Sequence, residues 1–346
     1  MTLPNRPTTN RQWRLAQRPV GEISKSDLEF TEAPIDELAP GQVLVRNIYL
    51  SLDPTNRIWM SDVDQYMPPV AIGEVMRGGT IGVVEESTFD GLKVGDIVLP
   101  GLGNWQDYVI VPGTQANKVP MEFGLPLTAF MSAVGMTGAT AYFGLLDIGK
   151  VQAGETVVIS AAAGAVGSIA GQIAKIKGAR VIGIAGSDEK CKWLTDELGF
   201  DGAINYKSED LLVRLGELCP DGIDVDFENV GGATLDAVLT LINNNARIAL
   251  CGLISTYNTE GPVPGPYMFQ NILMHRAHVE GFIIIDYLHR MPEALMALGT
   301  WVLEGKIKYK VDVQQGLENA PTALNRLFTG ENTGKLLVQI SEEPAA

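Results

Sequence analysis

The stretch Thr156-Val-Val-Ile-Ser160-Ala-Ala-Ala-Gly164-Ala-Val-Gly167-Ser-Ile-Ala170 decides the fold of this chain. It opens with a short apolar, β-branched run, which is typical of a strand that is buried on both faces. From residue 165 to residue 176 the apolar side chains follow a helical period instead. A buried strand that passes through a Gly/Ala-rich turn into an amphipathic helix predicts the first βα unit of a parallel sheet.

Further alternations of strand and helix follow this unit. The expected strands are residues 179–184, 202–205, 223–227, 246–251 and 277–285. Three helix-length segments separate the first four of these strands. They lie around residues 187–198, between residue 205 and about residue 219, and around residues 234–242. Repeated βα units of this kind predict an α/β fold with a Rossmann-type, doubly wound parallel sheet.

The two ends of the chain show a different pattern. Short strand patterns separated by Gly and Pro turns occupy residues 42–51, 79–85, 96–99 and 105–111, and another lies at residues 335–340. We therefore expect a β-rich, barrel-like domain built from residues 1–134 and 310–346, with the α/β domain, residues 135–309, inserted between them.

Composition narrows the classes of partner and location. The 346 residues carry 26 basic and 41 acidic side chains, which gives a formal charge of −15. Such a chain repels nucleic acid and anionic lipid, so we expect neither as a partner. Residues 1–20 lack an apolar run of signal-peptide length, and glycines or polar residues interrupt the uncharged stretches 123–146 and 156–174. We expect a cytoplasmic protein with no membrane partner.

The turn after the first strand matches a dinucleotide-binding fingerprint. Gly164 would let the backbone approach a pyrophosphate, and Gly167 would let the helix pack closely against the strand. The N–H groups of Ala165 and Val166, with the helix N-terminus, would face the anion. A tight turn with no ligand would have the same composition, but the position between a buried strand and an amphipathic helix favours the nucleotide.

The end of the second strand favours NADPH over NADH. NAD sites usually carry an acidic residue there, whereas this strand runs into Gly186 and Ser187. Asp188 already belongs to the next helix, whose N-terminus it suits. Lys190 would pair with a 2′-phosphate, unless it is an ordinary exposed lysine, and Tyr206 would cover the adenine side.

The ligands of a catalytic zinc ion are missing from the β-rich region, which contains neither His nor Cys. The three histidines (His275, His278, His289) and the three cysteines (Cys191, Cys219, Cys251) all fall within the α/β half. No third ligand lies near the His275 and His278 pair, and the cysteines are widely spaced, so we expect no metal site.

Hydride addition to an activated carbon–carbon double bond needs only a hydrogen-bond donor, because the negative charge spreads over an enolate. Tyr257 follows an expected strand at the sheet edge where ligands bind. Its hydroxyl would stabilise the enolate or supply a proton. A loop tyrosine that merely packs against the cofactor is the alternative.

The chain resembles the zinc-independent medium-chain dehydrogenase/reductase family, in the group of leukotriene hydroxydehydrogenases, prostaglandin reductases and bacterial curcumin reductases. The resemblance covers nearly the whole chain. It rests on Ser51-Leu-Asp-Pro54 and on residues 135–146, 161–171, 186–190, 205–206, 228–232, 251–258, 281–284, 316–321, 332 and 334–335.

This resemblance implies a GroES-like domain beside the Rossmann domain and NADPH-dependent reduction of α,β-unsaturated ketones and aldehydes. Hydride would go to the β-carbon, and Tyr257 would hold the enolate. The residues implied to line NADPH, besides Gly164–Gly167, Lys190 and Tyr206, are Asn229, Cys251, Gly252, Leu253, Ile254, Ser255, Phe282, Ile283, Ile284 and Asn332. A homodimer is also implied, with residues 279–285 as the expected edge strand.

One departure from the family affects the substrate pocket. The family usually reads Asp-Pro-Tyr-Met-Arg where this chain has Asp53-Pro54-Thr55-Asn56-Arg57. The missing tyrosine is part of the pocket wall in relatives. Its loss would leave a more open pocket, unless Tyr66 or Met67 from the next loop fills its place. Two other functions stay open at this point: a quinone reductase on the same scaffold, and an NADPH-binding protein without catalysis.

Overall fold

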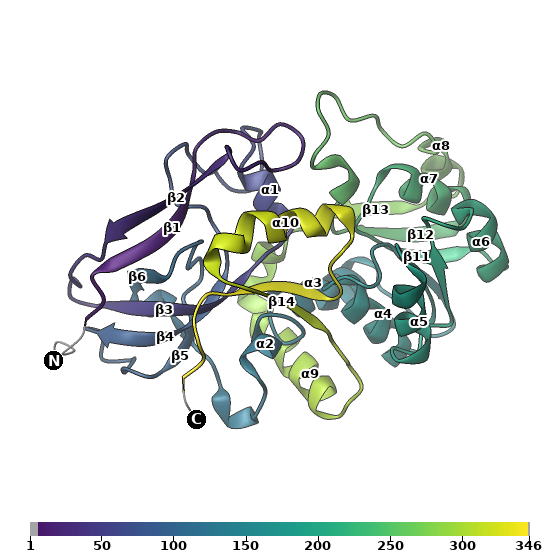
Figure 1. Ribbon diagram of the computed structural model, residues 1–346. Coiled ribbons are helices and arrows are strands. Elements are labelled where there is room, and N and C mark those ends of the chain that lie inside the picture. Colours follow the sequence, from purple (N-terminus) through teal and green to yellow (C-terminus); the bar gives the residue numbers. More distant parts are fainter. Residues whose placement is uncertain (1–5, 345–346) are drawn as a thin grey trace. The chain divides into compact units, whose positions relative to one another are not determined.

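The computed structural model describes residues 6–344 and divides the chain into two compact units (Figure 1). Unit 1 comprises Met1–Met131, Asp312–Glu331 and Leu336–Ala346, and unit 2 comprises Ser132–Val311 and Asn332–Lys335. The four residues Asn332–Lys335 lie with unit 2, whereas the prediction placed all of residues 310–346 in the β-rich domain. We describe each unit by itself.

Unit 2 contains a six-stranded sheet in the order β10-β9-β8-β11-β12-β13. Every neighbouring pair is parallel, which confirms the predicted doubly wound sheet. The chain adds strands outward from β8 to β10 and then returns to the other side of β8 with β11. The strands are β8 (Thr156–Ile159), β9 (Arg180–Ala185), β10 (Gly202–Asn205), β11 (Ile223–Glu228), β12 (Ile242–Leu250) and β13 (His278–Gly281).

Helices pack on both faces of this sheet. Strand β8 shows the consequence, because Val157 and Ile159 join a core cluster with α3, α4 and α9, whereas Val158 joins the cluster formed with α6 and α7. The helices are α3 (Met136–Phe143), α4 (Gly167–Ile176), α5 (Asp188–Asp196), α6 (Leu211–Leu218), α7 (Gly232–Thr240), α8 (Gln270–Met274) and α9 (Met291–Leu303).

Three predicted element boundaries in unit 2 are wrong. Strand β12 begins at Ile242 rather than at Ala246, because α7 already ends at Thr240. Helix α4 begins at Gly167 rather than at Ala165, because residues 161–166 form the turn that precedes it. Strand β13 ends at Gly281 rather than at Ile285. Phe282 leaves the strand direction and packs its ring near Phe227, 6.4 Å between centroids, and the chain then coils into a 3-10 turn.

Unit 1 is the β-rich part of the chain. Its main sheet has the order β14-β15-β3-β4-β5-β7, with β6 also paired to β3, and β1 and β2 form a separate antiparallel pair. Its strands are β1 (Thr9–Leu15), β2 (Leu28–Pro34), β3 (Gln42–Ser51), β4 (Thr80–Ser87), β5 (Ile97–Leu99), β6 (Tyr108–Pro112), β7 (Asn117–Lys118), β14 (Val311–Gln315) and β15 (Lys335–Gln339), and its helices are α1 (Thr55–Trp59), α2 (Leu127–Phe130) and α10 (Ala320–Thr329).

Both chain ends contribute to the core of unit 1. Leu15 and Leu50 from the first part of the chain share one buried cluster with Leu324 of α10 and Val338 of β15. This cluster explains why the C-terminal segment returns to a domain that the N-terminal segment began.

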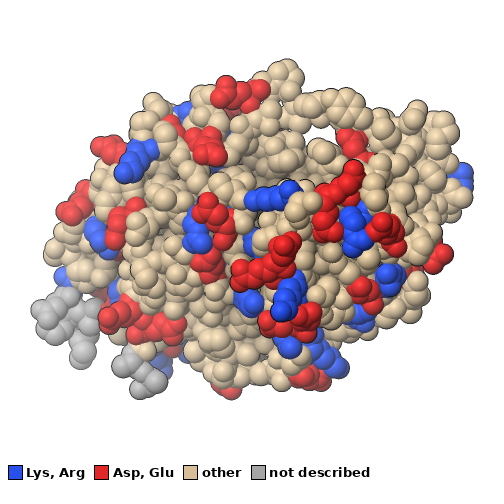
Figure 2. All heavy atoms as spheres, turned by 45° about the vertical axis from the view of Figure 1, so that its right-hand side comes forward, with Lys and Arg blue, Asp and Glu red and all other residues tan. Residues whose placement is uncertain are grey.

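Acidic and basic side chains are interspersed on the face of the molecule drawn in Figure 2, with no large basic patch there. This distribution agrees with the net charge of −15. Among the described residues, none of the helices combines the length and the apolar character needed to cross a membrane.

Candidate active site

The carboxyl edge of the unit 2 sheet gathers the predicted cofactor-binding residues. Because all six strands are parallel, the segments that follow them lie along one edge. The segments are residues 160–167 after β8, 186–190 after β9, 206–207 after β10, 229–232 after β11, 251–257 after β12 and 282–284 after β13. Asn332 is the single predicted cofactor residue that does not follow one of these strands.

The turn after β8 is tightly wound and has the backbone donors that an anion would need. Ala161 has a φ of +48°, and its carbonyl accepts the N–H of Gly164 at 2.9 Å. A left-handed conformation costs a non-glycine residue about 1 kcal/mol, and such strain is typical of ligand-binding turns. Within residues 6–344 the N–H groups of Ala165 and Val166 have no hydrogen-bond acceptor. These donors precede the N-terminus of the ten-residue helix α4, so the turn fits a pyrophosphate.

The two glycines of this turn have different surroundings. A Cβ on Gly164 would meet a single atom within 4 Å, the carbonyl oxygen of Ala161 at 3.1 Å. A Cβ on Gly167 would lie 2.5 Å from the same oxygen and 2.9 Å from the Cα of Ala162. Gly164 therefore leaves open space beside the backbone, whereas Gly167 permits the close packing of helix and turn.

Gly334 fastens the C-terminal segment to this turn. Its N–H donates to the carbonyl of Ala163 at 3.0 Å, and it forms an isolated bridge with Gly164. Gly334 has a φ of +70°, and a Cβ there would lie 2.1 Å from the carbonyl oxygen of Lys310, so only glycine fits. This link brings Asn332, whose side-chain nitrogen donates to the Gly334 carbonyl at 3.1 Å, to the same edge.

The segments after β9 and β10 form the second part of the edge. Ser187 caps helix α5, since its Oγ accepts the N–H of Lys190 at 3.3 Å. The side chain of Tyr206 lies over Gly186, 3.2 Å from the position that a Cβ would take there. Asp188 is engaged elsewhere, because its Oδ1 accepts the Asn205 amide at 2.6 Å. Strand β9 runs into Gly186 and Ser187, so none of the described carboxylates lies at its tip, where a ribose partner is expected.

Lys207 is a residue that the sequence reasoning missed. Its Cε lies 3.3 Å from the Cβ position of Gly186, so this lysine and Tyr206 flank the end of β9. The one signal in the sequence was its position directly after Tyr206. That position alone does not distinguish Lys207 from an ordinary exposed lysine.

The loops after β11 and β12 are tied to each other and to β8. The side-chain nitrogen of Asn229 donates to the Ser160 carbonyl at 2.7 Å. The carbonyl of Glu228 accepts the N–H groups of Cys251 at 2.9 Å and Gly252 at 3.1 Å. The Ser255 hydroxyl donates to the Val230 carbonyl at 2.6 Å. The three loops therefore form one hydrogen-bonded edge.

Tyr257 turns its hydroxyl toward its own loop. Its Oη accepts the N–H of Leu253 at 2.9 Å, and it lies 3.2 Å from the position that a Cβ on Gly252 would take. Gly252 therefore makes room for the hydroxyl. A phenol oxygen that already accepts a hydrogen bond is a stronger donor through its own O–H group.

Burial decides the chemistry of Cys251 and the orientation of Phe282. Burial, followed by the nearby Glu228 carboxylate, raises the pKa of the Cys251 thiol to about 12. The thiol therefore stays protonated at neutral pH and is a poor nucleophile. The ring of Phe282 is buried and packs at 6.4 Å from Tyr287. Ile283 and Ile284, which follow it, are half-buried.

In unit 1, Tyr66 is the residue that reaches Thr55. Their hydroxyls are hydrogen-bonded, and the indole nitrogen of Trp59 donates to Tyr66 Oη at 3.0 Å. Asn56 is buried and accepts the Asp53 N–H through its Oδ1 at 2.8 Å. Met67 contacts the neighbouring core cluster instead.

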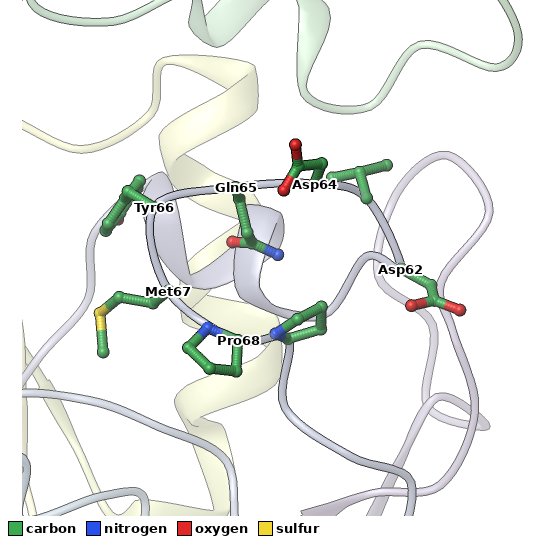
Figure 3. Close-up of a pocket in the computed structure, with 8 residues that line it drawn as sticks. Asp62, Asp64, Gln65, Tyr66, Met67 and Pro68 are labelled. Carbon is green, nitrogen blue, oxygen red and sulfur yellow. The ribbon is translucent and has the colours of Figure 1, made fainter.

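A pocket of about 430 Å³ lies within the loop that carries Tyr66 (Figure 3). The Gln65 side chain points toward the middle of the loop, and its amide nitrogen donates to the Ile58 carbonyl at 3.2 Å. The lining is confined to this one loop, residues 62–69.

The residues present offer little to a metal ion. In the part of the chain that the structure describes, no group of three or more His, Cys, Asp or Glu side chains is arranged to hold one. His278 pairs with Glu280 at 2.8 Å, and the three cysteines lie apart with free thiols.

Two family models match the chain. Residues 11–119 match the N-terminal domain of oxidoreductase, and residues 165–300 match a domain described as zinc-binding dehydrogenase. The first match falls in unit 1 and the second in unit 2.

Characterised relatives align over almost the entire chain. The NADPH-dependent curcumin reductase of Escherichia coli is 44% identical over 96% of this chain and 97% of its own. Prostaglandin reductase 1 of Bos taurus is 42% identical over 95% of this chain and 98% of its own. The crystal structure of CurA in complex with NADPH from Vibrio vulnificus superposes with a TM-score of 0.90. It is 45% identical and covers 96% of this chain and 100% of its own. As the sequence predicted, the chain therefore belongs to the zinc-independent medium-chain dehydrogenase/reductase family, in the group of the curcumin and prostaglandin reductases.

Proposed function

We propose that this protein is an NADPH-dependent reductase of the carbon–carbon double bond of α,β-unsaturated ketones and aldehydes. The observation that carries the proposal is the continuous edge of loops after all six strands of unit 2. A protein that merely bound the nucleotide would need only the phosphate and adenine contacts, whereas this edge extends to Tyr257. The similarity to curcumin and prostaglandin reductases supports the same activity.

Residues along the whole edge would hold NADPH. The turn from Gly164 to Gly167 would receive the pyrophosphate, and Lys190 and Lys207 would face the 2′-phosphate beside the ring of Tyr206. Asn229, residues 251–255, residues 282–284 and Asn332 would line the rest of the cofactor. An acidic protein with a charge of −15 binds this anion through local donors, against the sign of its overall field.

In the proposed reaction the protein's side chains stabilise the negative charge that develops on the substrate. NADPH, when bound, supplies the hydride that adds to the β-carbon of the substrate. Negative charge then develops on the carbonyl oxygen as an enolate, and Tyr257 donates a hydrogen bond to that oxygen. A proton added at the α-carbon completes the saturated product. Incubation with NADPH and an acyclic enone is expected to consume both in equal amounts and to yield the saturated ketone.

Replacing Lys190 by alanine is expected to raise the dissociation constant for NADPH about tenfold, because a charged hydrogen bond to phosphate is worth ~1.5 kcal/mol or more. Affinity for NADH, which lacks the 2′-phosphate, is expected to stay the same. Fluorescence titration with both cofactors measures the two affinities. Lys192→Ala, on the same helix, is the matched control. An equal loss of both affinities would remove Lys190 from the phosphate site.

We also propose that two copies pair through β13, which lies at the end of the sheet and has β12 as its one neighbour. Apolar side chains are exposed on and beside this edge, including Val279 at 41%, Leu273 at 74% and Leu288 at 51%. An open, apolar strand edge is a ready template for a second strand. A dimer would continue the sheet across the two copies.

Val279→Lys is expected to convert such a dimer to a monomer, because a charged side chain on an edge strand opposes pairing. Analytical ultracentrifugation of the full chain measures the mass, and Leu212→Lys, at an exposed position of α6, is the control. A wild type that is monomeric at micromolar concentration would contradict the proposal.

The cytoplasmic location stays a prediction, supported by three free thiols, which suit a reducing compartment.

A further inference from the structure

Strand β11 carries three carboxylates on one face. Asp224, Asp226 and Glu228 alternate with apolar residues, so their side chains point the same way. Asp226 and Glu228 are buried to 1% and 0% exposure, in a strand with neighbours on both sides. Two ionised carboxylates in such a place would be very costly, so the pair requires an explanation.

Glu228 lies where three cofactor loops meet. Its Oε1 accepts the Ser160 hydroxyl at 2.6 Å, the Val230 N–H at 2.5 Å and the Gly231 N–H at 2.9 Å. Ser160 in turn accepts the Asn229 N–H at 2.7 Å. One carboxylate oxygen therefore joins the end of β8, where the phosphate turn begins, to the loop after β11.

The second oxygen of Glu228 and both oxygens of Asp226 have no donor among the described residues when both groups are ionised. Burial, and then the charge of Glu228, raise the pKa of Asp226 well above its ordinary value. Burial also raises the pKa of Glu228, but the hydrogen bonds from Ser160 and the loop oppose that rise. Asp226 is therefore the neutral acid of the pair, which removes the repulsion between two buried carboxylates.

We propose that Glu228 is a positioning residue that holds the loops after β8 and β11 in the shape that binds NADPH. The side chain of Glu228 is fully buried, so it would act through these loops and not by touching NADPH. The proposal rests on the proposed cofactor site, and it adds a pair of residues to which the sequence reasoning gave no role.

Glu228→Ala is expected to raise the dissociation constant for NADPH at least ~10-fold, since three donors lose their acceptor. Glu228→Gln keeps an acceptor toward the loop and a donor toward Asp226, so its affinity should stay within about twofold of wild type. Asp226→Asn likewise keeps a donor toward Glu228 and should bind NADPH normally. Fluorescence titration with NADPH, in the absence of any enone, measures the dissociation constant of each variant. Only variants that are folded are compared.

Asp224 offers a matched control on the same strand. Its carboxylate also joins β11 to β8, by accepting the Thr156 N–H at 2.9 Å. This contact lies at the amino ends of the strands, away from the cofactor loops. Asp224→Ala should lower the thermal midpoint and leave the NADPH affinity unchanged. If Glu228→Ala does not fold, Ser160→Ala replaces it, with a smaller loss of affinity expected.

An unchanged affinity in folded Glu228→Ala, or a failure of Glu228→Gln to restore binding, would overturn the positioning role. A wild-type protein that does not bind NADPH would overturn the proposed function as well. The two failures are thus distinguishable in one set of titrations.

Discussion

Gly164→Ala is expected to weaken NADPH binding by at least ~30-fold while the protein stays folded. The added methyl group would meet the carbonyl of Ala161 at 3.1 Å and nothing else within 4 Å, so the turn can accept it. It would, however, occupy the space through which the backbone approaches the pyrophosphate, beside the N–H groups of Ala165 and Val166. Calorimetric titration measures the affinity, and thermal unfolding measures the stability.

Gly167→Ala should behave differently, since its Cβ would lie 2.5 Å from the same oxygen and the backbone would have to move. We expect a loss of about 2 kcal/mol in unfolding free energy together with the loss of binding. Gly216→Ala is the control, because a Cβ on this glycine of helix α6 would meet nothing within 4 Å, and it should change neither quantity for the worse. Normal NADPH affinity in Gly164→Ala would show that the turn does not hold the phosphates.

Tyr257→Phe is expected to lower the turnover of an enone about 100-fold, which is typical for removal of one donor to a developing oxyanion. The affinity for NADPH should change little, because the ring remains in place. The lost hydroxyl also accepts the Leu253 N–H at 2.9 Å, so a small effect on the loop is expected. Steady-state kinetics at saturating NADPH give the turnover, and direct titration gives the affinity.

Tyr267→Phe is the matched control, since Tyr267 is 80% exposed in the segment that follows the Tyr257 loop. Its turnover should equal that of the wild type. Unchanged turnover in Tyr257→Phe would remove Tyr257 from catalysis and leave it as a loop residue that packs beside the cofactor.

Much of unit 2 was predictable because its signals are local. The buried run of β8, the turn at Gly164 and the amphipathic α4 each identify themselves within a few residues, and the parallel sheet follows from their repetition. The boundaries were less predictable. Residues 282–285 have strand composition, but the packing of Phe282 against Phe227 turns the chain into the core.

The parts of the site that were missed depend on contacts between distant segments. Nothing in the sequence shows that Glu228 meets Ser160, 68 residues earlier, or that Lys207 lies beside Gly186. The alternation of Asp224, Asp226 and Glu228 in a strand with neighbours on both sides was a visible signal, since such strands are usually apolar throughout. For the replaced pocket tyrosine, the sequence left an open pocket, Tyr66 and Met67 as alternatives, and the structure shows that Tyr66 is the one hydrogen-bonded to Thr55.

The most direct test of the account follows NADPH oxidation by the purified full-length protein against acyclic enones, 2-alkenals and para-quinones, with the products identified by mass spectrometry. Cofactor deuterated at the transferred position should place deuterium on the β-carbon of a saturated ketone or aldehyde. We predict rapid oxidation with the enones and alkenals and little with the quinones. Oxidation with quinones alone, or NADPH binding with no oxidation by any acceptor, would contradict the account.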